Sequence, residues 1–287
     1  MAESRLLLAA LALLIAFNYD FVDANKFYDE CDIPWGPENT WAEGDDFALS
    51  LTNSTGSMLR TKRQFLFGSV QIEIKLVPGN SAGTVTTYYT TSLGDNHDEI
   101  DFEFLGNETG QPYTIHTNVF ANGVGDKEQQ FKPWFDPSAD FHNYTIFWNP
   151  STIVWFVDQI PIRVFRNYES IGIPFPTFRP MKAYSSIWNA DEWATQKGRV
   201  KTDWTQAPFI ARYRNIQLNI CDCYNQGDIN QCSSSQNWYT APEYSKLNDE
   251  QLGQMQWVRN NYIIYDYCTD YERFNGQMAP ECSQPQY

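Results

Sequence analysis

The sequence predicts an all-β fold: a curved antiparallel β-sandwich of the jelly-roll type, followed by a short disulfide-stapled extension with one helix. Three observations carry this prediction. Short runs of alternating apolar and polar residues recur between 65 and 220. Aromatic residues make up 16% of the 287 residues, which suits sheet surfaces. Five of the six cysteines lie at or after position 221.

The first 24 residues have the pattern of a secretion signal. Arg5 supplies a positive start, residues 6–17 are almost wholly apolar, and residues 22–24 offer small side chains for cleavage. The apolar run is shorter than the ~20 residues that a membrane-spanning helix needs. We therefore expect cleavage after Ala24 and a secreted, extracellular protein. Residues 25–220 are expected to form the catalytic domain and residues 221–287 an extension packed on it, because no Pro- or Gly-rich linker separates them.

Charge and motif content exclude several functions. Twenty Lys and Arg residues stand against 35 Asp and Glu, a formal charge of −15, so a nucleic acid or an anionic membrane would be repelled. No nucleotide, haem or flavin motif is present, and we expect no cofactor. The 42% of hydrophobic residues is enough to bury a substantial core.

The clearest predicted strand covers residues 70–76, where apolar and polar residues alternate strictly. Similar β-branched or aromatic runs, bounded by Gly, Pro, Asn and Asp, cover residues 84–90, 113–119, 144–148, 153–157, 160–165, 181–188 and 213–220. Asp158 and Gln159 are predicted to form a tight hairpin turn between two of these strands. Many short strands with few helical segments indicate the sandwich.

The tail holds the one helical pattern. Leu252, Met255, Val258 and Tyr262 recur at spacings of three, three and four, and Asn248 with Gln251 three residues later predicts a capping box at the start of this helix. In a secreted protein the cysteines are expected to form disulfides that stabilise this extension.

Residues 97–106 carry the chemistry. On a strand, Glu99, Asp101 and Glu103 lie on one face while the apolar residues between them lie on the other. Three like charges on one face repel one another, and Asp and Glu are poor strand formers. The row therefore costs stability and indicates a function.

Retaining glycoside hydrolysis uses a pair of carboxylates. One is the nucleophile, and the other acts first as general acid and then as general base. A third carboxylate between them can raise the pKa of its neighbour. Residues four apart on a flat strand lie roughly 13 Å apart, so the strand must curve or the Glu99 and Glu103 side chains must lean together. A solvated acidic face and a calcium site of carboxylate oxygens remain open alternatives from the residues alone.

The segment 97–107 reads His-Asp-Glu-Ile-Asp-Phe-Glu-Phe-Leu-Gly-Asn, and further matching segments are 116–118, 128–131, 134–137, 147–150, 160–163, 185–190, 201–204, 261–270 and 273–274. Together these segments resemble the plant xyloglucan endotransglucosylase/hydrolase family, a branch of glycoside hydrolase family 16. The resemblance covers nearly all of the chain after residue 24 and implies a curved jelly roll and a retaining double displacement on a β-1,4-glucan backbone.

The resemblance also implies residue roles. Glu99 would be the nucleophile, Glu103 the general acid/base and Asp101 the carboxylate between them, with no metal in the site. The implied glycan-binding residues are His116, Thr117, Asn118, Asp126, Lys127, Glu128, Glu192, Trp193 and Arg273. Asn107 would be the glycosylated position, and the implied disulfides are Cys223 with Cys232 and Cys268 with Cys282. Cys31 and Cys221 stay unassigned, with a third bridge between them as an open alternative.

Some segments depart from the family pattern. Residues 35–39 (Trp-Gly-Pro-Glu-Asn) and 55–59 (Thr-Gly-Ser-Met-Leu) differ on the donor side, and Lys197 stands where the family usually has glycine. Three sequons, at Asn53, Asn107 and Asn143, are available for N-glycosylation. Trp188, Trp193 and Trp204 are candidates for a stacking surface, and each is equally well interpreted as a core residue.

We therefore expect a monomeric enzyme of the plant cell wall and apoplast that cuts a xyloglucan donor and transfers it from Glu99 to a glucan acceptor. One alternative is an endohydrolase of xyloglucan or mixed-linkage glucan, and another is a hetero-transglucanase with a different donor. The third is a non-catalytic glycan-binding sandwich, although such a protein would not need Glu99 and Glu103 together.

Overall fold

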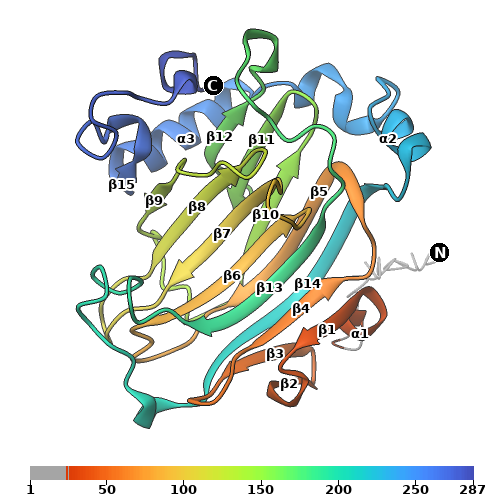
Figure 1. Cartoon of the computed structure of the whole chain (residues 1–287). Helices are drawn as coiled ribbons and strands as arrows, with labels where there is room; N and C mark the ends of the chain where they lie inside the picture. Colours follow the sequence, from red (N-terminus) through yellow and green to blue (C-terminus); the bar gives the residue numbers. More distant parts are fainter. Residues whose placement is uncertain (1–23, 25) are drawn as a thin grey trace, which may run out of the picture.

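The computed structural model describes residue 24 and residues 26–287. Two antiparallel sheets stack face to face (Figure 1). The eight-stranded sheet has the order β1 (Cys31–Trp35), β4 (Ser57–Thr61), β13 (Lys182–Asn189), β6 (Thr84–Thr91), β7 (Glu99–Leu105), β8 (Thr114–Phe120), β9 (Gln129–Phe131) and β15 (Ile263–Asp266). The predicted secretion signal and its cleavage site fall almost entirely outside the described residues.

The seven-stranded sheet lies behind the first in Figure 1. Its order is β12 (Ile160–Arg166), β11 (Thr152–Val157), β10 (His142–Trp148), β5 (Phe65–Lys75), β14 (Phe209–Asp222), β3 (Asp46–Leu51) and β2 (Thr40–Glu43). The described residues form the α-helices α1 (Lys26–Glu30), α2 (Gln226–Cys232) and α3 (Asp249–Asn261). The predicted all-β jelly-roll sandwich is confirmed.

Local sequence signals explain the elements that were predicted. Asp158 and Gln159 form the turn between β11 and β12, with φ of 49° and 66°, and positive φ at both central residues is the twist that a two-residue hairpin requires. The capping box of α3 is also present, since the Asn248 side chain accepts from the backbone N–H of Gln251 and the Gln251 side chain accepts in return.

The core between the sheets is aromatic. Phe102 and Phe104 of β7 are fully buried and lie with their rings 5.7 and 4.6 Å from the ring of Tyr144 on β10. Trp155 of β11 is fully buried, and its indole N–H donates to the backbone carbonyl of Asp101 at 2.9 Å. The seven-stranded sheet therefore packs against the inner face of β7 and fixes its backbone. The outer face of β7, which carries the acidic side chains, remains open to solvent.

The C-terminal extension closes one end of the sandwich (Figure 1). Its last strand, β15, pairs with β9 and so extends the eight-stranded sheet. Met255 and Val258 of α3 are buried, as the helical pattern predicted. No helix in the described part of the chain is long and apolar enough to cross a membrane.

One predicted disulfide is wrong. Cys232 is bonded to Cys221, with Cα atoms 5.7 Å apart, and Cys223 is a buried free thiol. A register shift near the end of β14 leaves Cys221 beside α2, whereas the Cys223 backbone N–H donates to the carbonyl of Gln64, the residue before β5. The predicted Cys268–Cys282 disulfide is present, and Cys31 is a buried free thiol, so no third bridge joins Cys31 to Cys221.

Candidate active site

One row of side chains crosses all eight strands of the first sheet. Pairing of neighbouring strands aligns Trp35, Met58, Ser186, Thr87, Glu103, His116, Gln130 and Tyr265, in that order from β1 to β15. Seven strand spacings of ~4.8 Å give a row of about 34 Å. This length suits an extended polymer, and Glu103 lies near its middle.

The acidic strand has the predicted alternation. Ile100, Phe102 and Phe104 are fully buried, whereas the Glu99 and Glu103 side chains keep 22% and 26% of their surface exposed. Both glutamates line one cavity of about 400 Å³ on the open face of the sheet. Asp101 between them is only 5% exposed, so its carboxyl is covered while its two neighbours are accessible.

Burial sets the protonation of these carboxyls. Burial, with a further contribution from the charge of Glu99, raises the pKa of Glu103 to about 7. Burial and the charges of both glutamates raise the pKa of Asp101 well above its usual range. The pKa of Glu99 is also raised by burial, against hydrogen bonds with Thr91 and Asp101 that lower it. The site can thus hold a proton on Glu103 near neutral pH.

A histidine stands beside each glutamate. His97 Nε2 lies 3.9 Å from Glu99 Oε2, and His116 Nε2 lies 3.9 Å from Glu103 Oε2. Burial lowers the pKa of His116 to about 4, so this ring is neutral at ordinary pH. Its Nδ1 accepts from the Gln130 amide at 3.1 Å, which leaves the ring proton on Nε2, toward Glu103.

The cavity extends from Glu103 toward β1. Trp35, Met58 and Trp188 line it together with the two glutamates. Trp35 is 38% exposed, and an exposed indole in a cavity offers a flat apolar surface to a sugar ring. Thr87 and Ser186 share a hydrogen bond of 2.7 Å on the cavity floor.

An ion cluster lies at the other end of the row. Arg273 of the extension donates to Glu128 through both terminal nitrogens, at 2.7 and 3.0 Å, and to Asp126 at 2.5 Å. It also donates to the Tyr265 hydroxyl at 3.0 Å. Burial acts to raise the pKa of Glu128, but the hydrogen bonds from Arg273 lower it overall. The extension therefore shapes this arm of the cleft.

The structure separates other predicted binding residues from the cleft. Thr117 alternates with His116 and is fully buried on the inner face of β8, where its hydroxyl donates to the Gln129 carbonyl and accepts from Arg163. The Lys127 ammonium is turned into its own loop and donates to the carbonyls of Val124 and Gly125. Neither side chain is free to contact a glycan.

Of the remaining predicted residues, Asn118 pairs with Asp101 across β7 and β8, and its side-chain oxygen accepts from the backbone N–H of Lys127. Glu192 and Trp193 are exposed in the loop after β13, with the Trp193 ring 6.0 Å from that of Trp188. Trp204 packs on Phe209 instead of the cleft.

Trp35 and Met58 lie in the segments 35–39 and 55–59 that the resemblance placed on the donor side. The sequence did not indicate the other site residues, namely Thr87, Ser186, Gln130, Tyr265 and, beside them, Tyr89. What these residues share is their position in the register of the eight strands. That register depends on pairing between distant segments, so no single segment of the sequence reveals it. In the described residues no group of three or more His, Cys, Asp or Glu is arranged to hold a metal ion.

Comparison with known proteins agrees with this architecture. The model of "Glycosyl hydrolases family 16" matches residues 27–206, and that of "Xyloglucan endo-transglycosylase (XET) C-terminus" matches residues 233–282. A solved prokaryotic beta-1,3-1,4-glucanase (lichenase) from a mouse hindgut metagenome is 26% identical, with a TM-score of 0.52 over 68% of this chain and 92% of that one. The chain belongs to glycosyl hydrolases family 16, a class of carbohydrate-active enzymes.

The curated relatives narrow the class. The probable xyloglucan endotransglucosylase/hydrolase protein 12 of Arabidopsis thaliana is 51% identical over 98% of this chain and 97% of its own length. Xyloglucan endotransglucosylase protein 7 of Diospyros kaki is 49% identical over 91% of this chain and 98% of its own. Within family 16 the chain is therefore a member of the xyloglucan endotransglucosylase/hydrolases, as residues 97–107 indicated.

Proposed function

We propose that this protein is a retaining xyloglucan endotransglucosylase in which Glu99 is the nucleophile and Glu103 the general acid/base. The proposal rests on one observation: Glu99 and Glu103 lie on the same face of β7 and line the same cavity. Within it, the pKa of Glu103 is raised to about 7. A carboxyl that stays protonated near neutral pH can act as the general acid beside a second carboxylate that acts as the nucleophile.

In the first step the Glu103 carboxyl donates its proton to the glycosidic oxygen while the Glu99 carboxylate attacks the anomeric carbon. The bond between that carbon and the glycosidic oxygen breaks, and the electron pair leaves with the oxygen, which becomes the new 4-hydroxyl of the departing chain. The other chain stays as a glycosyl ester on Glu99. Asp101, kept protonated by burial and by the neighbouring charge of Glu99, donates a hydrogen bond to Glu99 and holds its orientation.

In the second step the Glu103 carboxylate takes the proton from the 4-hydroxyl of an acceptor chain. The acceptor oxygen attacks the anomeric carbon, the ester bond breaks and the Glu99 carboxylate is released. Transfer outcompetes hydrolysis only if the acceptor is held well enough to outcompete water at ~55 M, which requires proximity and orientation. The arm of the row at Gln130, Tyr265 and Arg273 is the candidate for holding the acceptor.

The remaining expectations belong to the same proposal. The donor chain lies along Trp35, Met58 and Trp188, and the protein is secreted to the cell wall after removal of residues 1–24, as a monomer with residues 25–220 and 221–287 as its two parts. Asn107 carries a glycan in this proposal. Its sequon lies directly after the acidic strand, where the Asn107 amide donates to the Pro112 carbonyl at 3.0 Å.

The test mixes purified protein with xyloglucan and a fluorescent xyloglucan oligosaccharide and follows label in polymer together with new reducing ends. We expect label to enter polymer without a matching rise in reducing ends. Reducing ends without incorporation would instead establish an endohydrolase. Cellulose and mixed-linkage glucan as donors test the hetero-transglucanase alternative, and inactivity on all donors, together with retained binding, would leave the glycan-binding sandwich.

A further inference from the structure

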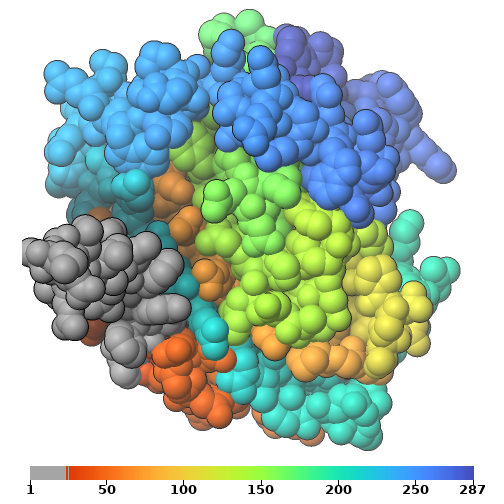
Figure 2. Space-filling model, turned by 180° about the vertical axis from the view of Figure 1, so that it is seen from behind, coloured from red at the N-terminus to blue at the C-terminus, as the bar shows by residue number. Residues whose placement is uncertain are grey.

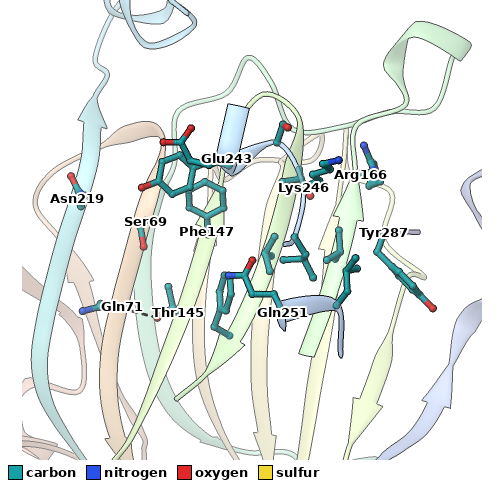
Figure 3. A pocket seen from close by; sticks show the side chains of 18 of the residues that line it. Ser69, Gln71, Thr145, Phe147, Arg166, Asn219, Glu243, Lys246, Gln251 and Tyr287 are labelled. Atoms are coloured by element: carbon teal, nitrogen blue, oxygen red, sulfur yellow. Dashed lines mark hydrogen bonds between the residues drawn. The ribbon is translucent and has the colours of Figure 1, made fainter. Parts of the chain in front are cut away.

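A second groove lies on the outer face of the seven-stranded sheet, on the side of the molecule seen in Figure 2. Its volume is about 480 Å³. Its floor is formed by β14, β5, β10, β11 and β12, and its roof by residues 238–252 and Tyr287 (Figure 3). None of its lining residues lines the cavity at Glu99 and Glu103.

One half of the floor is polar and uncharged. Strand pairing aligns Asn219 of β14 with Ser69 of β5 and Phe147 of β10, and in the next row it aligns Gln217, Gln71 and Thr145. Figure 3 shows the side chains of Asn219, Ser69, Gln71 and Thr145 directed into the groove. The charged lining residues, Arg166, Glu243 and Lys246, come from the far strand and the roof.

These polar groups are left without protein partners. Within the described part of the chain, the side chains of Ser69, Gln217 and Asn219 make no hydrogen bond, and Gln71 has only a long contact of 3.5 Å with Thr145. Gln217 and Asn219 are exposed. The floor therefore presents neutral donors and acceptors that remain available to a ligand.

Aromatic rings complete the groove above this floor. The rings of Phe147, Trp238 and Tyr244 contact one another at centroid distances of 5.3 to 6.0 Å. Trp238 and Tyr244 nevertheless stay 37% and 40% exposed. Flat aromatic faces beside uncharged amides and hydroxyls are the chemistry that recognises a neutral sugar, with its apolar ring face and its hydroxyl rim.

The chain carries an attachment point for such a sugar one row away. Asn143 of β10 pairs with Glu73 of β5, two residues before the pairing of Thr145 with Gln71. Side chains two residues apart on a strand lie on the same face, ~7 Å apart. Asn143 therefore lies in line with Thr145 and Phe147, at the open end of the polar floor.

The folded strand also leaves the Asn143 side chain able to bear a glycan. The Thr145 hydroxyl donates to Asn143 Oδ1 at 2.7 Å. Among the described residues Asn143 Nδ2 donates no hydrogen bond, and Nδ2 is the atom that bears an N-linked glycan. The native strand can therefore carry a glycan at this position without losing a protein contact.

We propose that Asn143 carries an N-linked glycan whose first sugars lie along this outer groove, on the polar floor and against the aromatic rings. Attachment one row away gives the sugars a high local concentration in the groove, so weak individual contacts are sufficient. This inference does not depend on the proposed reaction on the opposite sheet.

The first test is site-specific mass spectrometry of the protein secreted from a eukaryotic host. We expect a glycan on the peptide that contains Asn143 in the wild type and in Thr145→Ser, which keeps the sequon. The glycan should be absent from Asn143→Gln and Thr145→Ala. An unmodified Asn143 in the secreted wild type would overturn the proposal.

The second test measures release of the Asn143 glycan by a peptide N-glycosidase from the native and the denatured protein. If the sugars lie in the groove, release from the native wild type is at least about 10-fold slower than from the native Gln217→Ala, Asn219→Ala double variant, which corresponds to ~1.4 kcal/mol of groove binding. Both substitutions are at exposed positions, so the variant should fold and keep its activity. The denatured proteins should release the glycan at equal rates. Equal release from the two native proteins would contradict binding of the Asn143 glycan in the groove. The same result is expected if a free glucan occupies the groove, so that outcome would also overturn the proposal.

Discussion

The imidazole of His116 holds its only proton on Nε2, 3.9 Å from Oε2 of Glu103, because Gln130 donates to Nδ1 on the other side of the ring. Burial lowers the pKa of His116 to about 4. A neutral ring can orient the Glu103 carboxyl but brings no positive charge to it. This explains how Glu103 keeps a pKa of about 7 beside a histidine.

Replacing either glutamate should stop turnover. Glu99→Gln removes the nucleophile and Glu103→Gln the proton donor, and we expect a loss of at least about 10³-fold in rate for each. Glu99→Gln should still bind xyloglucan, measured by titration calorimetry, because the rest of the row is unchanged. Thr114→Val, on the neighbouring strand, is a control that should remain active. Turnover by Glu99→Gln above about a hundredth of the wild-type rate would exclude Glu99 as the nucleophile.

The stability of the protein should depend on the ionisation of Glu103. Its pKa in the folded state, about 7, lies above that of an unfolded Glu near 4.3. The folded state therefore binds this proton more tightly, and the contribution of Glu103 to the free energy of unfolding decreases as pH rises from about 4 to 7. Glu103→Gln should be more stable than the wild type by about 1–3 kcal/mol at pH 8 and equal to it at pH 4.

Urea unfolding of both proteins at the two pH values measures this difference. A variant that is less stable than the wild type at pH 8 would contradict the assignment of a protonated, buried Glu103. The activity of the wild type should show a bell-shaped pH profile, since Glu103 must be protonated in one step and ionised in the other.

The exposed indole of Trp35 should contribute to donor binding. Trp35→Ala is expected to raise KM for xyloglucan about 5- to 20-fold, the loss of one ring stacking contact of ~1–2 kcal/mol, with kcat little changed. Trp41→Ala is the matched control, because Trp41 lies on β2 of the other sheet. Kinetics over a range of donor concentrations separate the two constants, and an unchanged KM in Trp35→Ala would remove Trp35 from the donor site.

Arg273 should influence the acceptor more than the donor. Arg273→Ala breaks the paired hydrogen bonds to Glu128 and leaves the carboxylates of Asp126 and Glu128 without their cation. We expect a rise in acceptor KM of about 5- to 30-fold and a larger share of hydrolysis. Arg273→Lys should restore the transfer ratio only partly, because Lys cannot form the paired contact. A proportional loss of transfer and hydrolysis would indicate a purely structural role.

The cysteine pairing gives a direct chemical prediction. Titration of the unfolded, unreduced protein with a thiol reagent should find two free thiols, Cys31 and Cys223. Cys221→Ser should destabilise the protein by about 2–3 kcal/mol, since it opens an 11-residue loop, whereas Cys223→Ser should keep the disulfide and lose less than about 1.5 kcal/mol. The reverse ranking in thermal unfolding would restore the pairing of Cys223 with Cys232.

Strong local patterns allowed much of the fold to be predicted from the sequence. The strict alternation within β5, the turn at Asp158 and Gln159 and the cap of α3 at Asn248 each depend on residues that are close in the chain. Short strands such as β1 and β9 escaped prediction because three to five residues carry too little periodicity. Cys221 and Cys223, two residues apart, could not be told apart because the register shift in β14 decides between them.

The same distinction holds for the candidate site. Glu99, Asp101 and Glu103 stand on one strand, so their common face was predictable. Trp35 and Tyr265 reach the site through the pairing of eight strands, and only that pairing aligns residues 230 positions apart. Thr117 was assigned to glycan binding by resemblance, although alternation with His116 directs its side chain into the core.

The most direct test of the central claim is the mass of the peptide that contains Glu99 after wild-type protein is mixed with a xyloglucan oligosaccharide donor and rapidly quenched in acid. We predict a glycosyl adduct on Glu99 that disappears when an acceptor is added before the quench and is absent from Glu99→Gln. An adduct on Glu103 or Asp101, or full turnover without any adduct on the acidic strand, would contradict the account.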